Sequence, residues 1–340
     1  MRRNERPITQ DGFRQSEGAP SLYKTFRALT VGLGLLAFTS TISAKADTQS
    51  PRVAEVVASL SKGHFMENVA VSRENDLYIT DYVGRTILQY REGEGLRLVQ
   101  RLDVYPVGIA AHETGFVVSA HSGSLMAGVG NTGQNVILEL DADGKVTDTF
   151  AVPGARFLNG LAQIANDQFI VADSALGIIY LVDTAQNTAQ RWLDDERLAP
   201  ADPHSPVPAA NGIKLNDGLA YISNSSKRLL LTVPADDPRP DSIKVVLSGV
   251  TIDDFVFAND GHIFAATHSH EVLCISDQFD VSVFANQDQS IAGATAAAIV
   301  ERKEGAYLYV VGDGGLFEGL ELQPPAIVRL PLSGDSTCRH

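Results

Sequence analysis

The chain has 340 residues, of which 44% are hydrophobic and 20% are charged, a composition typical of a folded globular protein and not of a disordered one. Its net charge is −14, with 41 acidic residues against 27 basic ones, and a surface of that sign repels phosphate backbones and anionic lipids. The composition therefore argues against nucleic acid as a partner.

The N-terminal segment has a different composition from the rest of the chain. Lys24 and Arg27 precede an apolar run over residues 28–38, and small residues then lead to Ala44-Lys45-Ala46. This order is typical of a secretory signal peptide, and the run is too short to cross a bilayer, which takes about 20 apolar residues. We therefore predict a signal peptide over residues 1–46 and a secreted or periplasmic protein over residues 47–340, with no membrane partner after cleavage.

Two cysteines follow the predicted signal, Cys274 inside an apolar run and Cys338 near the C-terminus. An oxidising compartment would allow them to pair. The alternative is one buried thiol and one thiol in the tail, and sequence spacing does not decide between the two, because pairing depends on distance in space.

Short alternating apolar runs bounded by Gly, Asp and Asn recur through the mature chain, which favours an all-β fold. Six segments share one pattern, a strand, a polar turn and a second strand: residues 67–81, 107–121, 159–173, 211–224, 253–268 and 295–313. Equivalent positions are 40 to 52 residues apart, which is the size of a propeller blade.

Two more apolar runs lie between successive copies, so each repeat supplies four strands and the chain is predicted to be a single six-bladed β-propeller domain. The last repeat lacks its fourth strand, and an unpaired run over residues 53–60 precedes the first repeat. We expect this N-terminal strand to close the last blade and so to remove an open sheet edge. The Pro-rich segment 194–210 is expected at the rim of the ring, where the inner strands begin.

The first strand of each blade lines the central channel, so the residue just before it is expected to face one mouth of that channel. Four of these six positions carry side-chain oxygens, and the full set is Glu67, Val107, Asn159, Asn211, Asp253 and Thr295. Two carboxylates and two carboxamides suit a hard cation such as Ca²⁺ better than zinc, which prefers His and Cys. Each residue alone would be an ordinary turn former, but their shared register predicts a metal site.

These residues give the chain a resemblance to the SMP-30/gluconolactonase-like propellers, and more distantly to paraoxonase and strictosidine synthase, over residues 65–311. The resemblance implies one Ca²⁺ or similar ion held by Glu67, Asn159, Asn211 and Asp253, with Asp253 also acting as acid/base. It further implies hydrolysis of a small-molecule lactone or related ester. The chain departs from the family around these residues, with Asn68-Val69-Ala70 after the Glu, Asn159-Gly160 in place of Asn-Asp-Gly, and Asp253-Asp254 in place of Asp-Gly.

Other readings remain open. A propeller of this kind could be a non-hydrolytic cyclase or synthase, or a non-enzymic binding protein with a structural metal. His268-x-His270 could bind a metal, although alternate strand residues are more often polar edge residues. Asp81, Asp173 and Asn224 follow second strands and are expected to be turn acceptors.

Overall fold

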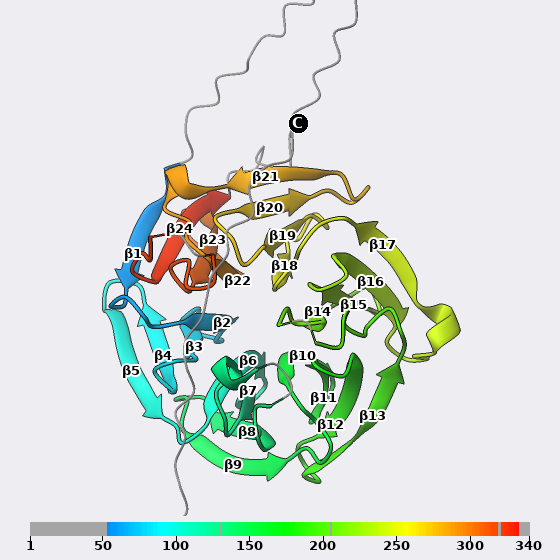
Figure 1. The fold of residues 1–340 in the computed structure, drawn as a ribbon. Coiled ribbons are helices and arrows are strands. Elements are labelled where there is room, and N and C mark those ends of the chain that lie inside the picture. The colour runs from blue at the N-terminus through cyan, green and yellow to red at the C-terminus, as the bar shows by residue number, and fades with distance from the viewer. Residues whose placement is uncertain (1–52, 129–130, 205, 319–320, 333–340) are drawn as a thin grey trace, which may run out of the picture. The chain divides into compact units, whose positions relative to one another are not determined.

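The computed structural model describes residues 53–128, 131–204, 206–318 and 321–332. In these residues six four-stranded antiparallel sheets surround a central axis (Figure 1), which confirms the six-bladed β-propeller. The predicted signal peptide, the cleavage site after Ala46 and Cys338 lie outside the described residues. Among the residues described, no helix is long and apolar enough to cross a membrane.

Each blade runs from an inner strand at the axis to an outer strand at the rim (Figure 1). Blade 1 comprises β2 (Met66–Val71), β3 (Leu77–Asp81), β4 (Thr86–Arg91) and β5 (Gly95–Arg101). Blade 2 comprises β6 (Tyr105–His112), β7 (Gly115–His121), β8 (Asn135–Asp141) and β9 (Val146–Ala151). Blade 3 comprises β10 (Leu158–Ala165), β11 (Gln168–Asp173), β12 (Ile178–Asp183) and β13 (Thr188–Asp194).

The second half of the ring follows the same plan. Blade 4 comprises β14 (Ala210–Asn216), β15 (Leu219–Asn224), β16 (Leu229–Pro234) and β17 (Lys244–Ser248). Blade 5 comprises β18 (Phe255–Phe257), β19 (Ile263–Ala266), β20 (Val272–Ile275) and β21 (Val281–Ala285). Blade 6 comprises β22 (Ala294–Arg302), β23 (Gly305–Gly312), β24 (Ala326–Leu332) and β1 (Glu55–Ser59).

The N-terminal strand closes the ring, as the leftover runs predicted. Strand β1 pairs antiparallel with β24, so that Glu55 lies opposite Arg329 and Ser59 opposite Ala326. The Arg329 guanidinium also forms an ion pair with Glu55 at 2.5 Å. The outer edge of β24 is thereby covered, and both ends of the ring meet within one sheet.

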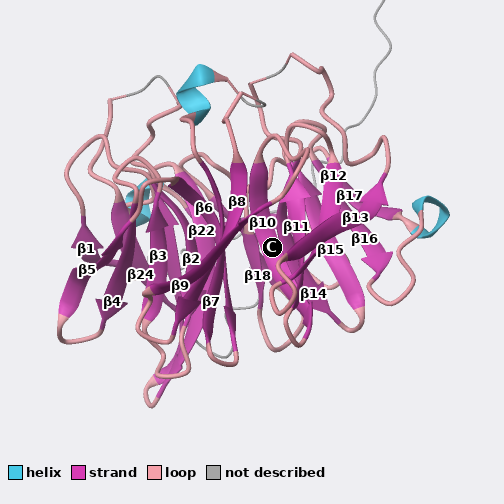
Figure 2. Ribbon diagram, turned by 90° about the horizontal axis from the view of Figure 1, so that it is seen from below, coloured by secondary structure: helices cyan, strands magenta, loops and turns pink. Residues whose placement is uncertain are grey.

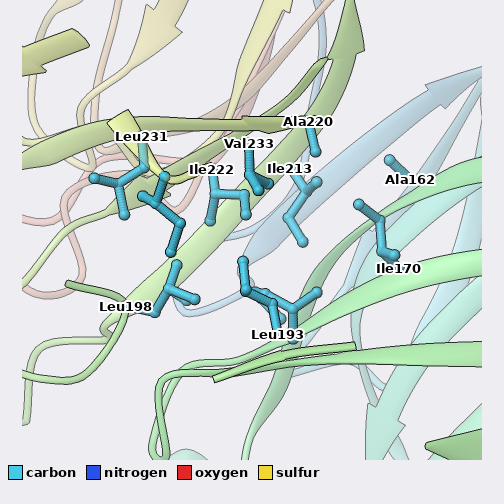
Figure 3. Close-up of a cluster of buried hydrophobic side chains, with 13 residues drawn as sticks. Ala162, Ile170, Leu193, Leu198, Ile213, Ala220, Ile222, Leu231 and Val233 are labelled. Carbon is cyan, nitrogen blue, oxygen red and sulfur yellow. The ribbon is translucent and has the colours of Figure 1, made fainter. Parts of the chain in front are cut away.

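Apolar side chains fill the spaces between neighbouring blades. In the cluster between blades 3 and 4, Ile170 and Leu193 meet Ile213, Ile222 and Leu231, all of them buried (Figure 3). Because strand residues alternate between the two faces of a sheet, each blade buries one set of side chains against each neighbour. This packing fixes the angle between blades, and it holds the inner strands around the axis.

The longer connections gather on one face of the ring (Figure 2). They join the second strand of a blade to its third, or the outer strand of a blade to the next inner strand. The segment between β7 and β8 carries a short 3-10 helix, η1 (Leu125–Ala127), and the Pro-rich segment lies between β13 and β14. Since the inner strands begin on this face, its loops surround one mouth of the channel; we call it the loop face.

Candidate metal centre at the channel mouth

A register break marks the mouth end of most inner strands. Pairing of the inner strand with its neighbour shifts at Met66/Asn68 in blade 1, at Leu158/Leu161 in blade 3 and at Ala210/Ile213 in blade 4. Such breaks are β-bulges, which re-aim side chains next to a functional site. Glu67, Asn159 and Asn211 sit inside these bulges, each as the second residue of its strand. The expectation that these residues lie just before their strands is therefore wrong. Each strand begins two positions earlier than expected, because its pairing with the neighbouring strand continues on the N-terminal side of the bulge.

Glycines after two of these residues permit a close approach between blades. A Cβ on Gly160 would lie 2.4 Å from the carbonyl oxygen of Asn211, and one on Gly212 would lie 2.8 Å from that of Asp253. Only a residue without a side chain fits there, so the Asn-Gly pairs bring the mouth residues of adjacent blades together.

Buried hydroxyls tie three of the mouth residues, Val107, Asn159 and Asp253, to the blade before them. Ser119 accepts a hydrogen bond from the Gly108 amide (2.9 Å) and donates to the carbonyl oxygen of Asn159 in the next blade (2.6 Å). Thr80 makes the same pair of bonds with Asn68 and Val107. We call this arrangement the hydroxyl latch. It satisfies buried backbone groups that the bulges leave without ladder partners.

The two asparagines of the predicted metal set are held alike. Nδ2 of Asn159 donates to the Ser174 hydroxyl at 3.1 Å, and Nδ2 of Asn211 donates to the Ser225 hydroxyl at 3.0 Å. Nδ2 of Asn211 also donates to Oδ1 of Asp253 at 2.5 Å. Because the amide nitrogens are engaged by neighbours, the amide oxygens are the atoms left to accept from, or bind to, a partner at the mouth.

The two carboxylates of the set are buried, and that of Glu67 is poorly compensated. Glu67 is 9% exposed and Asp253 is 5% exposed. Oε2 of Glu67 has no hydrogen-bond partner in the described part of the chain. Burial, followed by repulsion from Asp253, raises the pKa of Glu67 well above its usual value. Burying a carboxylate without a partner is energetically costly. A cation bound by Glu67 would offset that cost.

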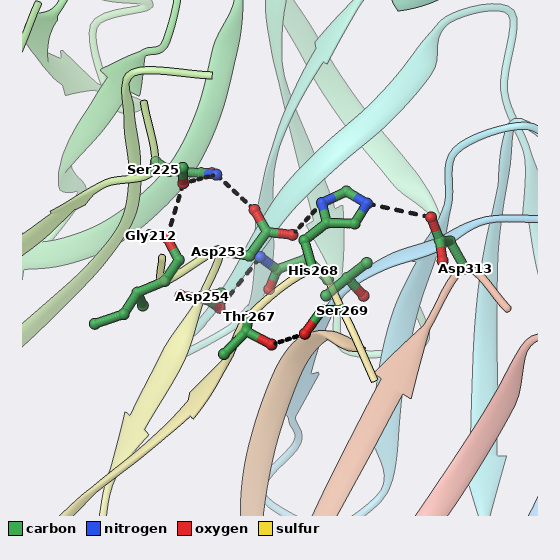
Figure 4. A network of polar contacts seen from close by, with 12 residues as sticks. Gly212, Ser225, Asp253, Asp254, Thr267, His268, Ser269 and Asp313 are labelled. Carbon is green, nitrogen blue, oxygen red and sulfur yellow. Dashed lines mark hydrogen bonds and ion pairs between the residues drawn. The ribbon is translucent and has the colours of Figure 1, made fainter. Parts of the chain in front are cut away.

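A third carboxylate and a histidine adjoin them (Figure 4). Nδ1 of His268 lies 2.9 Å from Oδ2 of Asp253, and Nε2 lies 3.1 Å from Oδ2 of Asp313. Asp313 is fully buried, and its Oδ1 accepts from the Gly315 amide at 2.7 Å. Burial alone would lower the pKa of His268, but the two carboxylates outweigh it and raise that pKa well above its usual value.

The backbone of His268 is in the left-handed region, with φ of 55°, a conformation that non-glycine residues adopt at a cost. Strand β19 ends at Ala266 and β20 begins at Val272, so His268 and His270 lie in the connection between them. The expectation of an alternating pair at a strand edge is therefore wrong. His268 faces Asp253, while His270 pairs with Glu318 at 2.6 Å.

The remaining mouth positions have other roles. Thr295 donates to the carbonyl oxygen of Met66 at 2.6 Å and so joins blade 6 to blade 1. Val107 is buried among aromatic side chains. Below the mouth, Asp254 accepts from Asn68 at 3.2 Å and pairs with Lys214 at 2.5 Å. The charge of Asp254 is thus balanced within the chain, unlike that of Glu67.

The donor set fits a hard cation by its chemistry: two carboxylates and two amides whose nitrogens are already engaged. In the described residues no three His, Cys, Asp or Glu side chains gather closely enough to hold a metal by themselves. A cation at this mouth would therefore depend on the amide oxygens of Asn159 and Asn211 together with Glu67 and Asp253. The metal site remains a prediction, and the four residues named here are those that would form it.

Asp173 and Asn224 accept hydrogen bonds from backbone amides, as expected of turn acceptors. Asp173 accepts from the amides of Arg156 (2.8 Å) and Phe157 (3.2 Å), and Asn224 accepts from the amide of Lys227. Tyr82 and Phe157 belong to a buried cluster beside the mouth, and Trp192 packs on the core between blades 3 and 4.

Comparison with known proteins places the fold. No protein-family model matches the sequence, and no curated protein matches it by sequence. Among solved structures, a luciferin-regenerating enzyme superposes with a TM-score of 0.59 at 18% identity, covering 83% of this chain and 96% of that one. The chain has the fold of the SMP-30/gluconolactonase-like propellers.

Two further structures support the same statement. A gluconolactonase from Xanthomonas campestris gives a TM-score of 0.58 at 16% identity, covering 82% of this chain and 89% of that one. A regucalcin from Agrobacterium tumefaciens, described as a calcium-binding protein, gives a TM-score of 0.58 at 12% identity and covers 82% and 93%. At such identities the likeness concerns the fold, and the chemistry has to be argued from this chain's own residues.

Proposed function

We propose that the chain is an exported, divalent-metal-dependent hydrolase of lactones or related esters, with Ca²⁺ as the ion. The observation that carries the proposal is the pair of buried carboxylates, Glu67 and Asp253, at a mouth that also presents the amides of Asn159 and Asn211. These four residues would hold the ion. When bound, it would supply positive charge to polarise the substrate carbonyl.

The chain's own residues account for the rest of the reaction. Asp253 is the acid/base, because its Oδ2 faces the mouth beside His268 while Oδ1 is held by Asn211. It would accept a proton from the attacking water and then return that proton to the leaving oxygen of the lactone or ester as the C–O bond breaks. Asp313 holds the far nitrogen of His268 and so keeps the imidazole directed at Asp253. The export part of the proposal rests on residues 24–46 of the sequence.

The proposal is tested with the full chain and the variants Asp253→Ala and Asn211→Ala. After chelation, hydrolysis of a panel of lactones and esters is followed by proton release as Ca²⁺, Mg²⁺, Mn²⁺ or Zn²⁺ is restored. We expect metal-restored activity in the parent protein and a loss of at least about 100-fold in the variants. As a control, Asp202→Ala, in an exposed turn, should retain full activity. Equal activity in all four proteins would contradict the mechanism.

The two other functions give different results in the same experiment. A cyclase or synthase would consume a reactive precursor without incorporating oxygen from labelled water. A binding propeller with a structural ion would retain the metal, and gain thermal stability from it, without turning over any member of the panel.

A further inference from the structure

The ring of mouth residues has one apolar sector. Val107 stands between Glu67 and Asn159 in blade order and is 1% exposed. It belongs to a buried cluster with Phe65, Tyr82 and Phe157, against which Tyr105, Leu125, Ala175 and Leu316 pack. We call these eight residues the mouth cluster. The cluster places packed apolar side chains directly beneath one sector of the mouth, next to the oxygen donors.

Exposed apolar side chains continue this surface on the loop face. Val83 (40% exposed), Met126 (57%), Val207 (42%) and Phe317 (46%) come from four different connections, all of which open onto that face. Exposed hydrophobic residues scattered singly need no explanation, but Phe317 is distinguished by its contacts with groups at the mouth.

Phe317 links this exposed surface to the reactive groups. Its ring lies 5.5 Å from the imidazole of His268 and 5.6 Å from the ring of Phe65, centroid to centroid, edge-on in both cases. Two ring contacts hold the side chain in place although nearly half of it faces solvent. His268 in turn contacts Asp253. The half-exposed ring of Phe317, which we call the apolar wall, is therefore separated from the proposed acid/base Asp253 by the side chain of His268.

The opposite side of the mouth cluster is also fixed. The Tyr82 hydroxyl accepts a hydrogen bond from the Leu125 amide at 2.6 Å, and the Tyr82 ring lies 5.5 Å from Phe65. This bond holds the η1 segment, and with it Met126, against the cluster. The wall is therefore preorganised from blades 1, 2 and 6, and a ligand that covers it pays little for ordering side chains.

We propose that the substrate carries an alkyl or aryl group beside its lactone or ester bond, and that polyhydroxylated sugar lactones are poor substrates. This inference rests on the proposed function and specifies its substrate class. An apolar group that leaves water to cover the exposed ring of Phe317, which the mouth cluster supports from beneath, gains binding energy with each methylene buried. The hydroxyls of a sugar lactone would lose water against the same surface without gaining partners there.

The test separates binding from turnover by using γ-lactams, which keep the ring and tail of a γ-lactone but resist hydrolysis. The full chain with Ca²⁺ is titrated with unsubstituted, 5-propyl and 5-hexyl γ-lactam and observed by ligand NMR. We expect affinity to rise by about two- to fourfold per methylene. Equal binding of the three lactams, or detectable binding of none, would overturn the proposal.

Two variants locate the effect. Phe317→Ala should weaken binding of the hexyl compound by about tenfold while leaving the unsubstituted lactam unchanged. Val283→Ala is the matched control, because Val283 is 51% exposed but lies on the outer strand β21, away from the mouth. A Phe317→Ala variant with an unchanged dependence on tail length would contradict the assigned wall.

The corresponding lactones are then assayed beside D-glucono-δ-lactone. Faster hydrolysis of the hexyl lactone supports both proposals. Tail-dependent lactam binding without hydrolysis of any lactone would overturn the hydrolase and leave the apolar specificity standing. Faster hydrolysis of the sugar lactone would overturn the specificity and leave the hydrolase standing.

Discussion

His121 shows how strongly burial acts on a single residue beside the mouth. The side chain is fully buried, with its ring 5.4 Å from Tyr82 and 5.1 Å from Phe157, and Nδ1 donates to the carbonyl oxygen of Gly123 at 2.6 Å. Nε2 has no partner in the described residues. Burial lowers the pKa of His121 to about 4, so the folded protein binds this proton less well than the unfolded chain.

The sign of the pH dependence follows. Above about pH 6.5 His121 is neutral in both the folded and the unfolded state, so it does not change the free energy of unfolding. Between about pH 6.5 and 4 the unfolded chain takes up the proton but the folded protein does not, and the free energy of unfolding falls by up to about 3 kcal/mol. Urea unfolding across this range measures the loss. We expect His121→Phe to reduce it and His204→Gln, at an exposed position, to leave it unchanged. Identical slopes in all three proteins would contradict the assignment.

Glu67 should show a conflict between stability and binding. Replacing the carboxylate by an amide in Glu67→Gln removes a buried charge that faces Asp253, so the metal-free protein should melt about 2–4 °C higher, corresponding to about 1 kcal/mol. The same variant should lose the thermal shift that Ca²⁺ produces in the parent. Differential scanning calorimetry with and without the ion measures both effects.

The exposed Glu74 supplies the matched control for that experiment. Glu74→Gln should melt like the parent and respond fully to Ca²⁺. A Glu67→Gln protein that kept the full Ca²⁺ shift would remove Glu67 from the proposed ligands.

The sequence predicted a set of oxygen donors at the mouth but not their neighbours. Glu67, Asn159, Asn211 and Asp253 share a register that repeats with the blades, and repetition is visible in a sequence. His268 and Asp313 end their repeat segments, as Asp81, His121, Asp173 and Asn224 end theirs, but a repeated position does not show which of these side chains contact the mouth residues. The left-handed backbone that directs His268 toward Asp253 depends on packing.

At the scale of the strands, the hydroxyl latch makes a clear prediction. Ser119→Ala leaves the Gly108 amide and the Asn159 carbonyl without their partner, and each is buried at the junction of blades 2 and 3. We expect a loss of about 1–3 kcal/mol in the free energy of unfolding. Ser248→Ala, at an exposed position of outer strand β17, should lose less than about 0.5 kcal/mol. If chemical denaturation gave the same loss of unfolding free energy for both variants, the hydroxyl latch would not stabilise the junction of blades 2 and 3.

Strand positions were largely predictable because alternating apolar residues record which side faces a neighbouring blade. The bulges at Asn159 and Asn211 were not, because they accompany a close approach of the next blade to Gly160 and Gly212, and the bulge at Glu67 has no glycine beside it. The sequence shows the glycines, but it does not show which backbone they approach. This is why the predicted starts of these inner strands were displaced at the mouth, whereas the closing strand predicted over residues 53–60 agrees with β1.

For the whole molecule, closure of the ring by β1 was predictable from the number of apolar strand segments. The last repeat lacks one such segment, and one unpaired segment precedes the first repeat. Removing residues 1–60 should therefore expose the edge of β24, where Val56 now lies opposite Val328. We expect this truncated protein to aggregate and to lose cooperative unfolding. A protein lacking only residues 1–46 should behave like the full chain in light scattering and calorimetry, and monodisperse behaviour of the longer deletion would contradict the role of β1.

A calcium titration of the chelated full chain, with heat of binding and lactone hydrolysis recorded at each addition, tests metal-dependent hydrolysis at this mouth. We expect one site per chain and hydrolysis that rises in proportion to its occupancy, both of which are lost in Asp253→Ala. Full activity before any ion is added, or a filled site without hydrolysis of any lactone or ester, would contradict it.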